Sequence, residues 1–250
     1  MAAEVFDDLP DAYDAMIDWP RRLANEEPFY RWLVQRVGAR SVLDVACGTG
    51  RHAAMLHSWG LRVEGADLSP AMIQRCRGRF GESDTLSWVV RGFDEAAGEP
   101  GRFDLAICTG NSLALAPDMA TVQRAVNRLL EAVRPGGAIV LHVVNLWRLA
   151  DGPCTWQKCR RAPLARGDSL IVKGLHRCGT RGYVDFLVVT LSGQEPAMQT
   201  ESVLFWGLES ADLEHMMRQA GARQIEIFGD YARSTYDRRR SQDLIVVASK

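Results

Sequence analysis

The sequence lacks several features that would define a function class at once. It has no apolar run long enough to cross a membrane. Its 30 basic and 31 acidic residues leave a formal net charge of −1, which gives no reason to expect nucleic acid or an anionic membrane as a partner. Residues 1–8 are acidic and lack the basic and apolar regions of a signal peptide. We therefore expect a cytoplasmic protein.

The sequence also lacks the cysteine spacing of a metal or redox site. None of its six cysteines forms a C-x-x-C pair. Cys154 and Cys159 are loosely spaced, with no second pair or histidine at a distance typical of zinc sites. We expect no metal.

What is present is an alternation of strand and helix patterns. The 250 residues, 47% of them hydrophobic, can bury one sizeable core. Alternating strands and helices indicate an α/β protein with a mostly parallel sheet and helices on both faces. After an N-terminal helical segment at 11–37, we expect strands at 41–46, 61–66, 86–90, 103–108, 138–144, 222–228 and 244–248, and helices at 51–59, from 69 onward, 118–133 and 210–220.

This rhythm is interrupted between Asp151 and Trp206, where no helical pattern occurs. Three runs, 169–176, 183–191 and 199–206, have strand character, and turn-forming residues separate them. We expect a small antiparallel β insertion. Its apolar and aromatic content fits either a substrate lid or a dimer surface.

The most informative segment is Val42–Gly50, in which an apolar run ends in Asp44 and then in Gly48-Thr49-Gly50. A second apolar run ends in Asp67. Glycines let a backbone turn sharply and approach a ligand closely. A carboxylate at the end of the second strand suits two ribose hydroxyls.

Asp44 argues against a nicotinamide dinucleotide. The third glycine position of that fingerprint holds Ala53, which the fingerprint tolerates. A carboxylate ahead of the glycines, however, repels a pyrophosphate, whereas it can accept hydrogen bonds from a cationic amino group. The segment indicates a nucleoside ligand that carries an ammonium group.

The pattern Asp-x-x-x-Gly-x-Gly resembles motif I of class I S-adenosylmethionine-dependent methyltransferases, and Arg134-Pro135-Gly136-Gly137 is frequent before their fifth strand. The resemblance covers about 41–145 and 209–250. It implies a Rossmann-like, seven-stranded sheet whose last strand is antiparallel. We expect three parts: residues 1–150 with the N-terminal helical segment and cofactor-binding core, the insertion at 151–207, and the completion of the core at 208–250.

A finer resemblance is to small-molecule N-methyltransferases with a β insertion, namely the glycine, glycine/sarcosine and amino-sugar enzymes. It rests on Tyr13-Asp14, on Arg22, on the segment Gly110-Asn111-Ser112, and on the position of the insertion. The glycine enzymes carry an Arg-Asn-Tyr segment after strand five, whose arginine grips the substrate carboxylate. This chain has Val144-Asn145-Leu146 there, which departs from the pattern for glycine.

The resemblance and the strand-end rule together give a candidate site. Asp44 or a backbone carbonyl would receive the cofactor ammonium, Arg22 its carboxylate, and Asp67 the ribose. Leu68, Met72, Phe93 and Asp94 would surround the adenine. The cofactor-binding candidates are Arg22, Asp44, Ala46, Gly48, Gly50, Asp67, Leu68, Met72, Phe93, Asp94, Thr109 and Asn111, and the catalytic candidates are Asn145, Tyr13 and His142.

The expected reaction is in-line attack of a small-molecule acceptor on the methyl group of S-adenosylmethionine, with S-adenosylhomocysteine as product (class EC 2.1.1). No Asp–His or Lys–Asp arrangement demands an O-methyl mechanism, so nitrogen is favoured. O- or C-methylation, a non-catalytic S-adenosylmethionine-binding module and an aminopropyltransferase are the alternatives, the last disfavoured because no paired-acid polyamine site is found. The acceptor, the oligomeric state and the task of the insertion stay open at this point.

Overall fold

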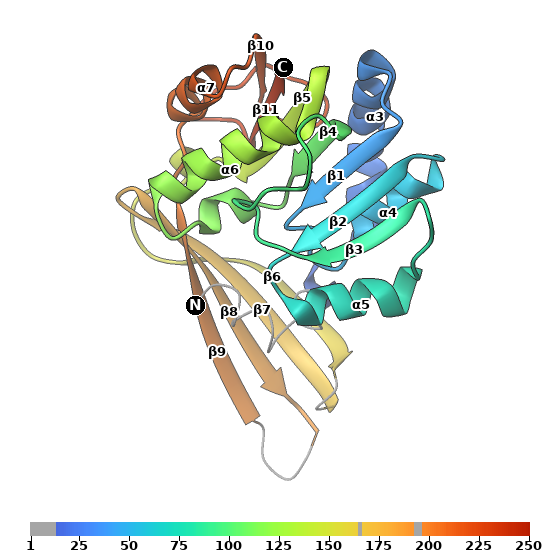
Figure 1. The fold of residues 1–250 in the computed structure, drawn as a ribbon. Helices are drawn as coiled ribbons and strands as arrows, with labels where there is room; N and C mark the ends of the chain where they lie inside the picture. Colours follow the sequence, from blue (N-terminus) through green and yellow to red (C-terminus); the bar gives the residue numbers. More distant parts are fainter. Residues whose placement is uncertain (1–13, 165–166, 193–196) are drawn as a thin grey trace.

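The computed structural model describes residues 14–164, 167–192 and 197–250. Its larger sheet has seven strands in the order β10-β11-β5-β4-β1-β2-β3 (Figure 1). All are parallel except β11, which runs antiparallel to both neighbours. This confirms the predicted fold class. The strands are β1 (Ser41–Val45), β2 (Arg62–Asp67), β3 (Leu86–Val90), β4 (Phe103–Cys108), β5 (Val133–Val144), β10 (Gln224–Phe228) and β11 (Asp243–Ser249).

Helices cover both faces of this sheet, because its central strands are apolar on both sides. The α3, α4 and α5 helices pack in one hydrophobic cluster, and α6 and α7 in the other. Asp18, Ser69 and Asp118 each accept a backbone hydrogen bond as helix N-caps. The helices are α3 (Trp19–Val37), α4 (Arg51–Ser58), α5 (Pro70–Phe80), α6 (Met119–Ala132) and α7 (Ser210–Gln219), with short 3-10 turns η1 (Ser112–Leu115) and η2 (Leu146–Arg148). No helix of the described residues is long and apolar enough to cross a membrane.

The smaller sheet is antiparallel and has four strands in the order β6-β7-β8-β9. They are β6 (Thr155–Leu164), β7 (Gly167–Cys178), β8 (Arg181–Thr190) and β9 (Ala197–Trp206). Three of them were predicted. The fourth, β6, was missed because this edge strand is polar and almost wholly exposed.

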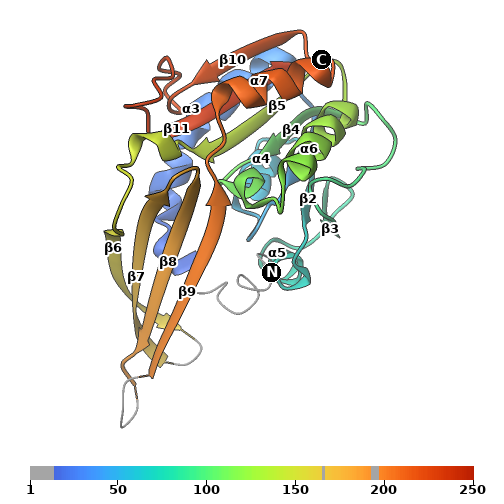
Figure 2. The same ribbon diagram turned by 90° about the vertical axis from the view of Figure 1, so that its left-hand side faces the viewer.

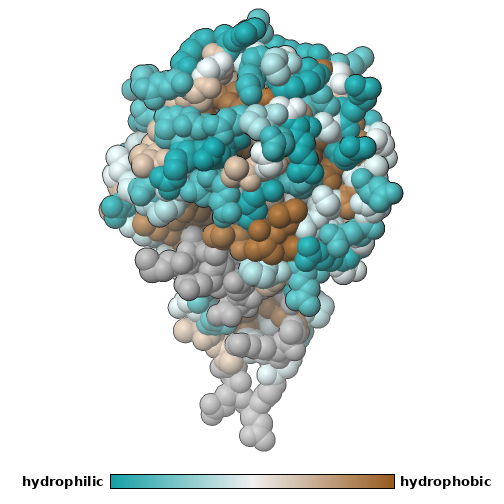
Figure 3. All heavy atoms as spheres, in the orientation of Figure 1, coloured by the Kyte–Doolittle hydropathy of each residue, from teal (hydrophilic) through white to brown (hydrophobic). Residues whose placement is uncertain are grey.

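The insertion sheet extends away from the carboxyl edge of the larger sheet (Figures 1 and 2). Its inner face packs against the N-terminal segment, where Met16 joins Ile171, Phe186 and Val188 in one buried hydrophobic cluster. Trp206 donates its indole N–H to the carbonyl of Ala116 at 2.9 Å, which ties β9 to η1. Apolar atoms gather on the visible surface at the level where the core meets the insertion (Figure 3).

Candidate functional site

The turn after β1 is held in a conformation that favours glycine. Ala46, Gly48 and Gly50 all have positive φ, at 52°, 54° and 76°. A Cβ at Gly50 would lie 2.7 Å from the Trp88 ring, whereas a Cβ at Gly48 would have no neighbour within 4 Å. Gly50 therefore lets the turn pack against β3. Gly48 has no side chain on the open side of the turn, so a ligand can approach the backbone there. Ala46 is a non-glycine residue in the left-handed region, a conformation that clusters at ligand sites.

The Asp67 carboxylate fixes the position of this turn. One oxygen accepts from the Gly48 N–H at 2.8 Å, and the other accepts from the Ser69 N–H at 3.0 Å. Each carboxylate oxygen can accept more than one hydrogen bond, so both can still receive ribose hydroxyls. Beside it, Leu68 is 58% exposed, an unusual position for a large apolar side chain at a strand end.

Asp44 is buried without a hydrogen-bond partner. Its side chain is 1% exposed, and neither carboxylate oxygen has a partner among the described residues. Burial, and secondarily the charge of Asp67, raises the pKa of Asp44 to about 8, although the nearby Ala53 backbone N–H and the charge of Arg22 oppose this rise. The Ala53 N–H does not reach hydrogen-bond geometry with either oxygen. A buried carboxylate without a partner is costly for the fold alone. It fits a ligand that brings a cation, as the ammonium group of S-adenosylmethionine would.

Arg22 is held close to this position from α3. Its guanidinium donates to Glu26 at 2.8 Å, and the second Glu26 oxygen lies 2.6 Å from His52 Nε2. Burial lowers the pKa of His52. Although burial opposes it, the hydrogen bond and charge of His52, together with Arg22, lower the pKa of Glu26 to about 2. The Arg22 charge also acts on Asp44. A cation beside a carboxylate matches the two ends of a zwitterionic amino acid.

Asp14, absent from the predicted site residues, anchors the N-terminal segment above the turn. Its carboxylate accepts from Trp19 Nε1 at 2.7 Å, Thr49 Oγ1 at 2.9 Å and Arg79 at 2.8 Å. The only sequence signal was its place in the Tyr13-Asp14 pair. Tyr13 itself lies outside the described residues, and its catalytic role stays a prediction.

His142 and Asn111 shape the loop after β4. The Gly110 N–H donates to His142 Nδ1 at 3.1 Å, and the Val144 N–H donates to Asn111 Oδ1 at 2.9 Å. His142 Nε2 lies 3.1 Å from Asp243, and the residue is 7% exposed. Thr109, which begins the loop, is 5% exposed. This geometry favours a positioning role for His142 over proton transfer to a substrate.

Asn145 is fully buried, and its amide is completely engaged within the chain. The two N–H bonds donate to the carbonyls of Arg238 and Ser241, at 3.0 and 2.8 Å. Its oxygen accepts from the Trp147 N–H and the Tyr236 hydroxyl. These four contacts fill the capacity of a side-chain amide. Asn145 therefore holds the segment 236–241 against the end of β5. Its amide has no further donor or acceptor position for a substrate.

The residues predicted around the adenine occupy three different environments. Met72 is 3% exposed. Phe93 is half-buried against the larger hydrophobic cluster. Asp94 forms an ion pair with Arg124 at 3.2 Å. Their contact with a cofactor stays a prediction.

Two other features lie away from this site. A cavity of about 310 Å³ opens at the opposite, amino edge of the sheet, beside Arg36 and Lys250. In the insertion, Cys154, His176 and Asp185 place potential metal-ligating atoms within 4.8 Å of one another. Asp185 there accepts from His176 at 2.8 Å and Ser202 at 2.7 Å. The expected absence of a metal stays a prediction.

Known proteins resemble the chain in sequence. Residues 42–137 match the methyltransferase domain family. Over 242 residues the chain is 28% identical to the glycine/sarcosine N-methyltransferase of Parasynechococcus marenigrum (strain WH8102), which covers 92% of this chain and 79% of that protein. Over 152 residues it is 35% identical to the glycine N-methyltransferase of Oryctolagus cuniculus, which covers 55% of this chain and 52% of that protein. The chain thus spans about half the length of the latter enzyme.

The fold is also known from solved structures. The sugar N-methyltransferase KedS8 from Streptoalloteichus sp ATCC 53650 superposes with a TM-score of 0.74 at 22% identity, covering 91% of this chain and 87% of that chain. This level of identity shows the fold alone. The domain match, the similarity to the glycine/sarcosine enzyme over most of the chain and the motif after β1 together support a class I S-adenosylmethionine-dependent methyltransferase.

Proposed function

We propose that the protein transfers the methyl group of S-adenosylmethionine to the nitrogen of a small-molecule amine. The observation that carries the proposal is the buried, unpaired carboxylate of Asp44 beneath the glycine turn. Asp44 would receive the cofactor ammonium, Arg22 its carboxylate and Asp67 its ribose hydroxyls. When bound, the cofactor supplies an activated methyl group on a sulfonium.

The described catalytic candidates support nitrogen as the attacked atom. The Nδ1 atom of His142 accepts from the Gly110 N–H, so the neutral ring carries its proton on Nε2, which is buried. The Asn145 amide is engaged within the fold, so neither side chain offers a basic atom to a substrate. An amine that arrives unprotonated needs no general base, whereas a hydroxyl does. Relatives named glycine/sarcosine, glycine and sugar N-methyltransferases agree with this choice.

The remaining task of the protein is to position the two substrates and exclude water. The strand ends and the turn at 46–50 form the cofactor side. The inner face of the insertion, which packs on the N-terminal segment, supplies the opposite wall. We assign the insertion to the acceptor side of the site.

Methyl transfer from radiolabelled S-adenosylmethionine, measured over a panel of amino acids, amino sugars, simple amines and phenols, tests this function. We expect an N-methyl product, identified by mass spectrometry, and loss of turnover in Asp67→Ala. An O- or C-methyl product would contradict nitrogen as the acceptor atom. Cofactor binding without turnover across the panel would support a non-catalytic binding module instead.

A further inference from the structure

Lys173 is a charged residue within an apolar row on the inner face of β7. Alternate residues of β7 point to the same face of the sheet, and Ile171, Lys173 and Leu175 therefore share the inner face. Ile171 is fully buried and Leu175 is 5% exposed. Directly across on β8, Lys173 pairs with the buried Phe186. A half-buried lysine thus interrupts an apolar row that packs against the N-terminal segment and the core.

The charged residues that act on Lys173 are also cations. Lys158 lies directly opposite on β6, and like charges at directly opposed positions destabilise a sheet. Burial is the main reason that the pKa of Lys173 falls to about 8, followed by the charges of Lys158 and Arg22. Among the described residues, no carboxylate forms an ion pair with Lys173. Glu201 shares its face, but two strands away, with Phe186 between them.

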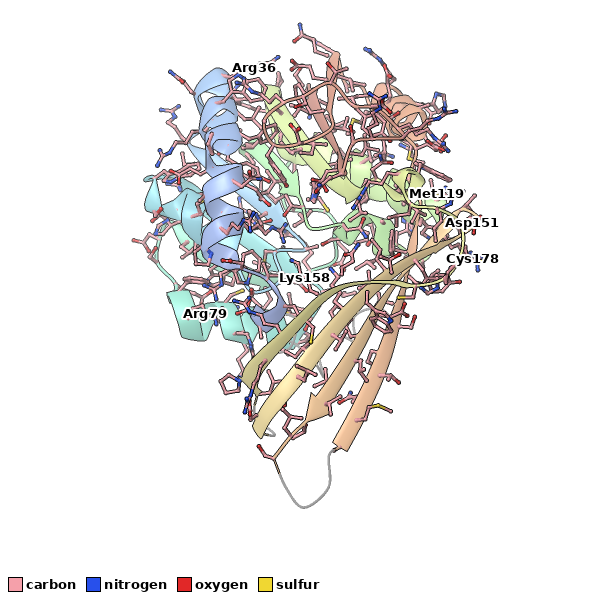
Figure 4. The ribbon with its side chains drawn as sticks, turned by 180° about the vertical axis from the view of Figure 1, so that it is seen from behind. Arg36, Arg79, Met119, Asp151, Lys158 and Cys178 are labelled. Atoms are coloured by element: carbon pink, nitrogen blue, oxygen red, sulfur yellow. The ribbon has the colours of Figure 1, made fainter. Side chains whose placement is uncertain are left out.

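Lys173 lies near the candidate site, since the charge of Arg22 acts on it. Arg22 is the residue assigned to the cofactor carboxylate. Seen from behind, Lys158 lies on β6 beside the lower end of α3, between the core and the insertion (Figure 4). A desolvated ammonium without a counter-ion is unfavourable for the fold alone. It becomes favourable when a ligand brings an anion to it.

We propose that Lys173, assisted by Lys158, binds an anionic group of the methyl acceptor. This inference rests on the proposed function and names its substrate class, an amine that also carries a carboxylate or a phosphate. The cofactor has one carboxylate, for which Arg22 is already placed. The segment after β5, Val144-Asn145-Leu146, offers no arginine for an acceptor carboxylate. Lys173 on the opposite wall supplies the missing cation.

Matched acceptors that differ only in the anion test the proposal. Glycine is compared with glycinamide, and a nucleoside-diphosphate amino sugar with the free amino sugar, which separates carboxylate from phosphate. We expect the intact protein to prefer one anionic member by about thirtyfold in kcat/KM. Lys173→Met should abolish this preference, mainly through KM, and Lys173→Arg should restore part of it. A preference that survives in Lys173→Met would overturn the proposal.

Binding measurements keep the test independent of turnover. In calorimetry, the affinity of Lys173→Met for S-adenosylhomocysteine should lie within about twofold of that of the intact protein, because Lys173 binds the acceptor and not the cofactor. The complex of the intact protein with S-adenosylhomocysteine should bind acetate or pyrophosphate, and the Lys173→Met complex should not. The assignment of Lys173 is wrong if neither anion binds to the intact protein. It is also wrong if Lys173→Met lowers the affinity for S-adenosylhomocysteine tenfold. Anion binding without any methyl transfer would instead reject the proposed function alone.

Discussion

Two buried polar side chains, Asp44 at the end of β1 and Asn145 after β5, occupy comparable places in the fold and have opposite environments. Asn145 fills all four of its hydrogen-bonding positions with groups of the chain. Asp44 fills none. The sequence marks both as site residues, because a polar residue at the carboxyl end of a parallel strand lies where ligands bind.

This difference in hydrogen bonding distinguishes a residue that stabilises the fold from a residue that binds a ligand. A buried polar group whose partners are all internal stabilises one conformation of the chain, and its removal leaves those partners unsatisfied. A buried polar group without a partner weakens the free protein and becomes stabilised when a ligand arrives. We therefore expect changes at Asn145 to act on stability, and changes at Asp44 and its neighbour Asp67 to act on cofactor affinity.

The largest expected effect is on the scaffold side. Asn145→Ala should lower the free energy of unfolding by about 3 kcal/mol, because buried carbonyls and donors lose their partners. Denaturant unfolding measures this change. Asn25→Ala, at an exposed position of α3, is the matched control and should change stability by less than about 0.5 kcal/mol. Unchanged stability of Asn145→Ala would show that the Asn145 amide does not stabilise the fold.

On the binding side, Asp67→Ala should have the largest effect. Loss of the ribose contacts and of the Gly48 and Ser69 hydrogen bonds should weaken cofactor binding about a hundredfold. Isothermal titration with S-adenosylhomocysteine measures it. Asp84→Ala removes an exposed carboxylate between α5 and β3 and should leave the affinity unchanged. Equal affinities of Asp67→Ala and the intact protein would show that the site is misplaced.

Asp44→Asn tests the role of the Asp44 carboxyl directly, since it keeps the shape of the side chain and removes its ability to carry a negative charge. We expect cofactor affinity to fall about tenfold, while the free protein stays as stable as before or becomes more stable. The same two assays apply, titration and denaturant unfolding. Destabilisation as large as that of Asn145→Ala would mean that Asp44 belongs to the scaffold.

The pH dependence of stability gives the smallest effect. Burial raises the pKa of Asp44 to about 8, so the folded protein binds a proton that the unfolded chain has released above its ordinary pKa of 3.8. The contribution of Asp44 to the free energy of unfolding is therefore complete below pH 3.8. It is lost as the pH rises from there towards 8. Relative to Asp44→Asn, the intact protein should therefore lose up to about 1.4 kcal/mol per pH unit between pH 6.5 and 7.5. A difference that does not vary with pH would contradict the raised pKa of Asp44.

The sequence predicts the core well where one strong pattern decides the structure. The strands β1 and β4 are short, mostly apolar runs, and the glycine turn after β1 has the left-handed backbone that glycine favours. The edge strand β6 carries Lys158, Arg160 and Arg161, so its apolar pattern is lost. It becomes a strand only because β7 pairs with it.

The hydrogen-bond partners of the candidate site residues could not be predicted from the sequence. Nothing in the chain around Asn145 shows that residues 236–241 return to fill its amide. Asp14 acquires its role only when Thr49 and Arg79 fold beneath it. Lys173 had a local signal, a lysine in register with Ile171 and Leu175, but its unpaired state depends on the neighbouring strands.

The most direct test of the account is proton release during cofactor binding. If the unpaired Asp44 carboxyl is protonated in the free protein and receives an ammonium in the complex, binding at pH 7 should release close to one proton. Calorimetric titration of S-adenosylhomocysteine in phosphate and in Tris buffer measures this number from the difference in heat. We predict the release of about one proton by the intact protein and of none by Asp44→Asn. Equal release by both proteins, or none by either, would contradict it.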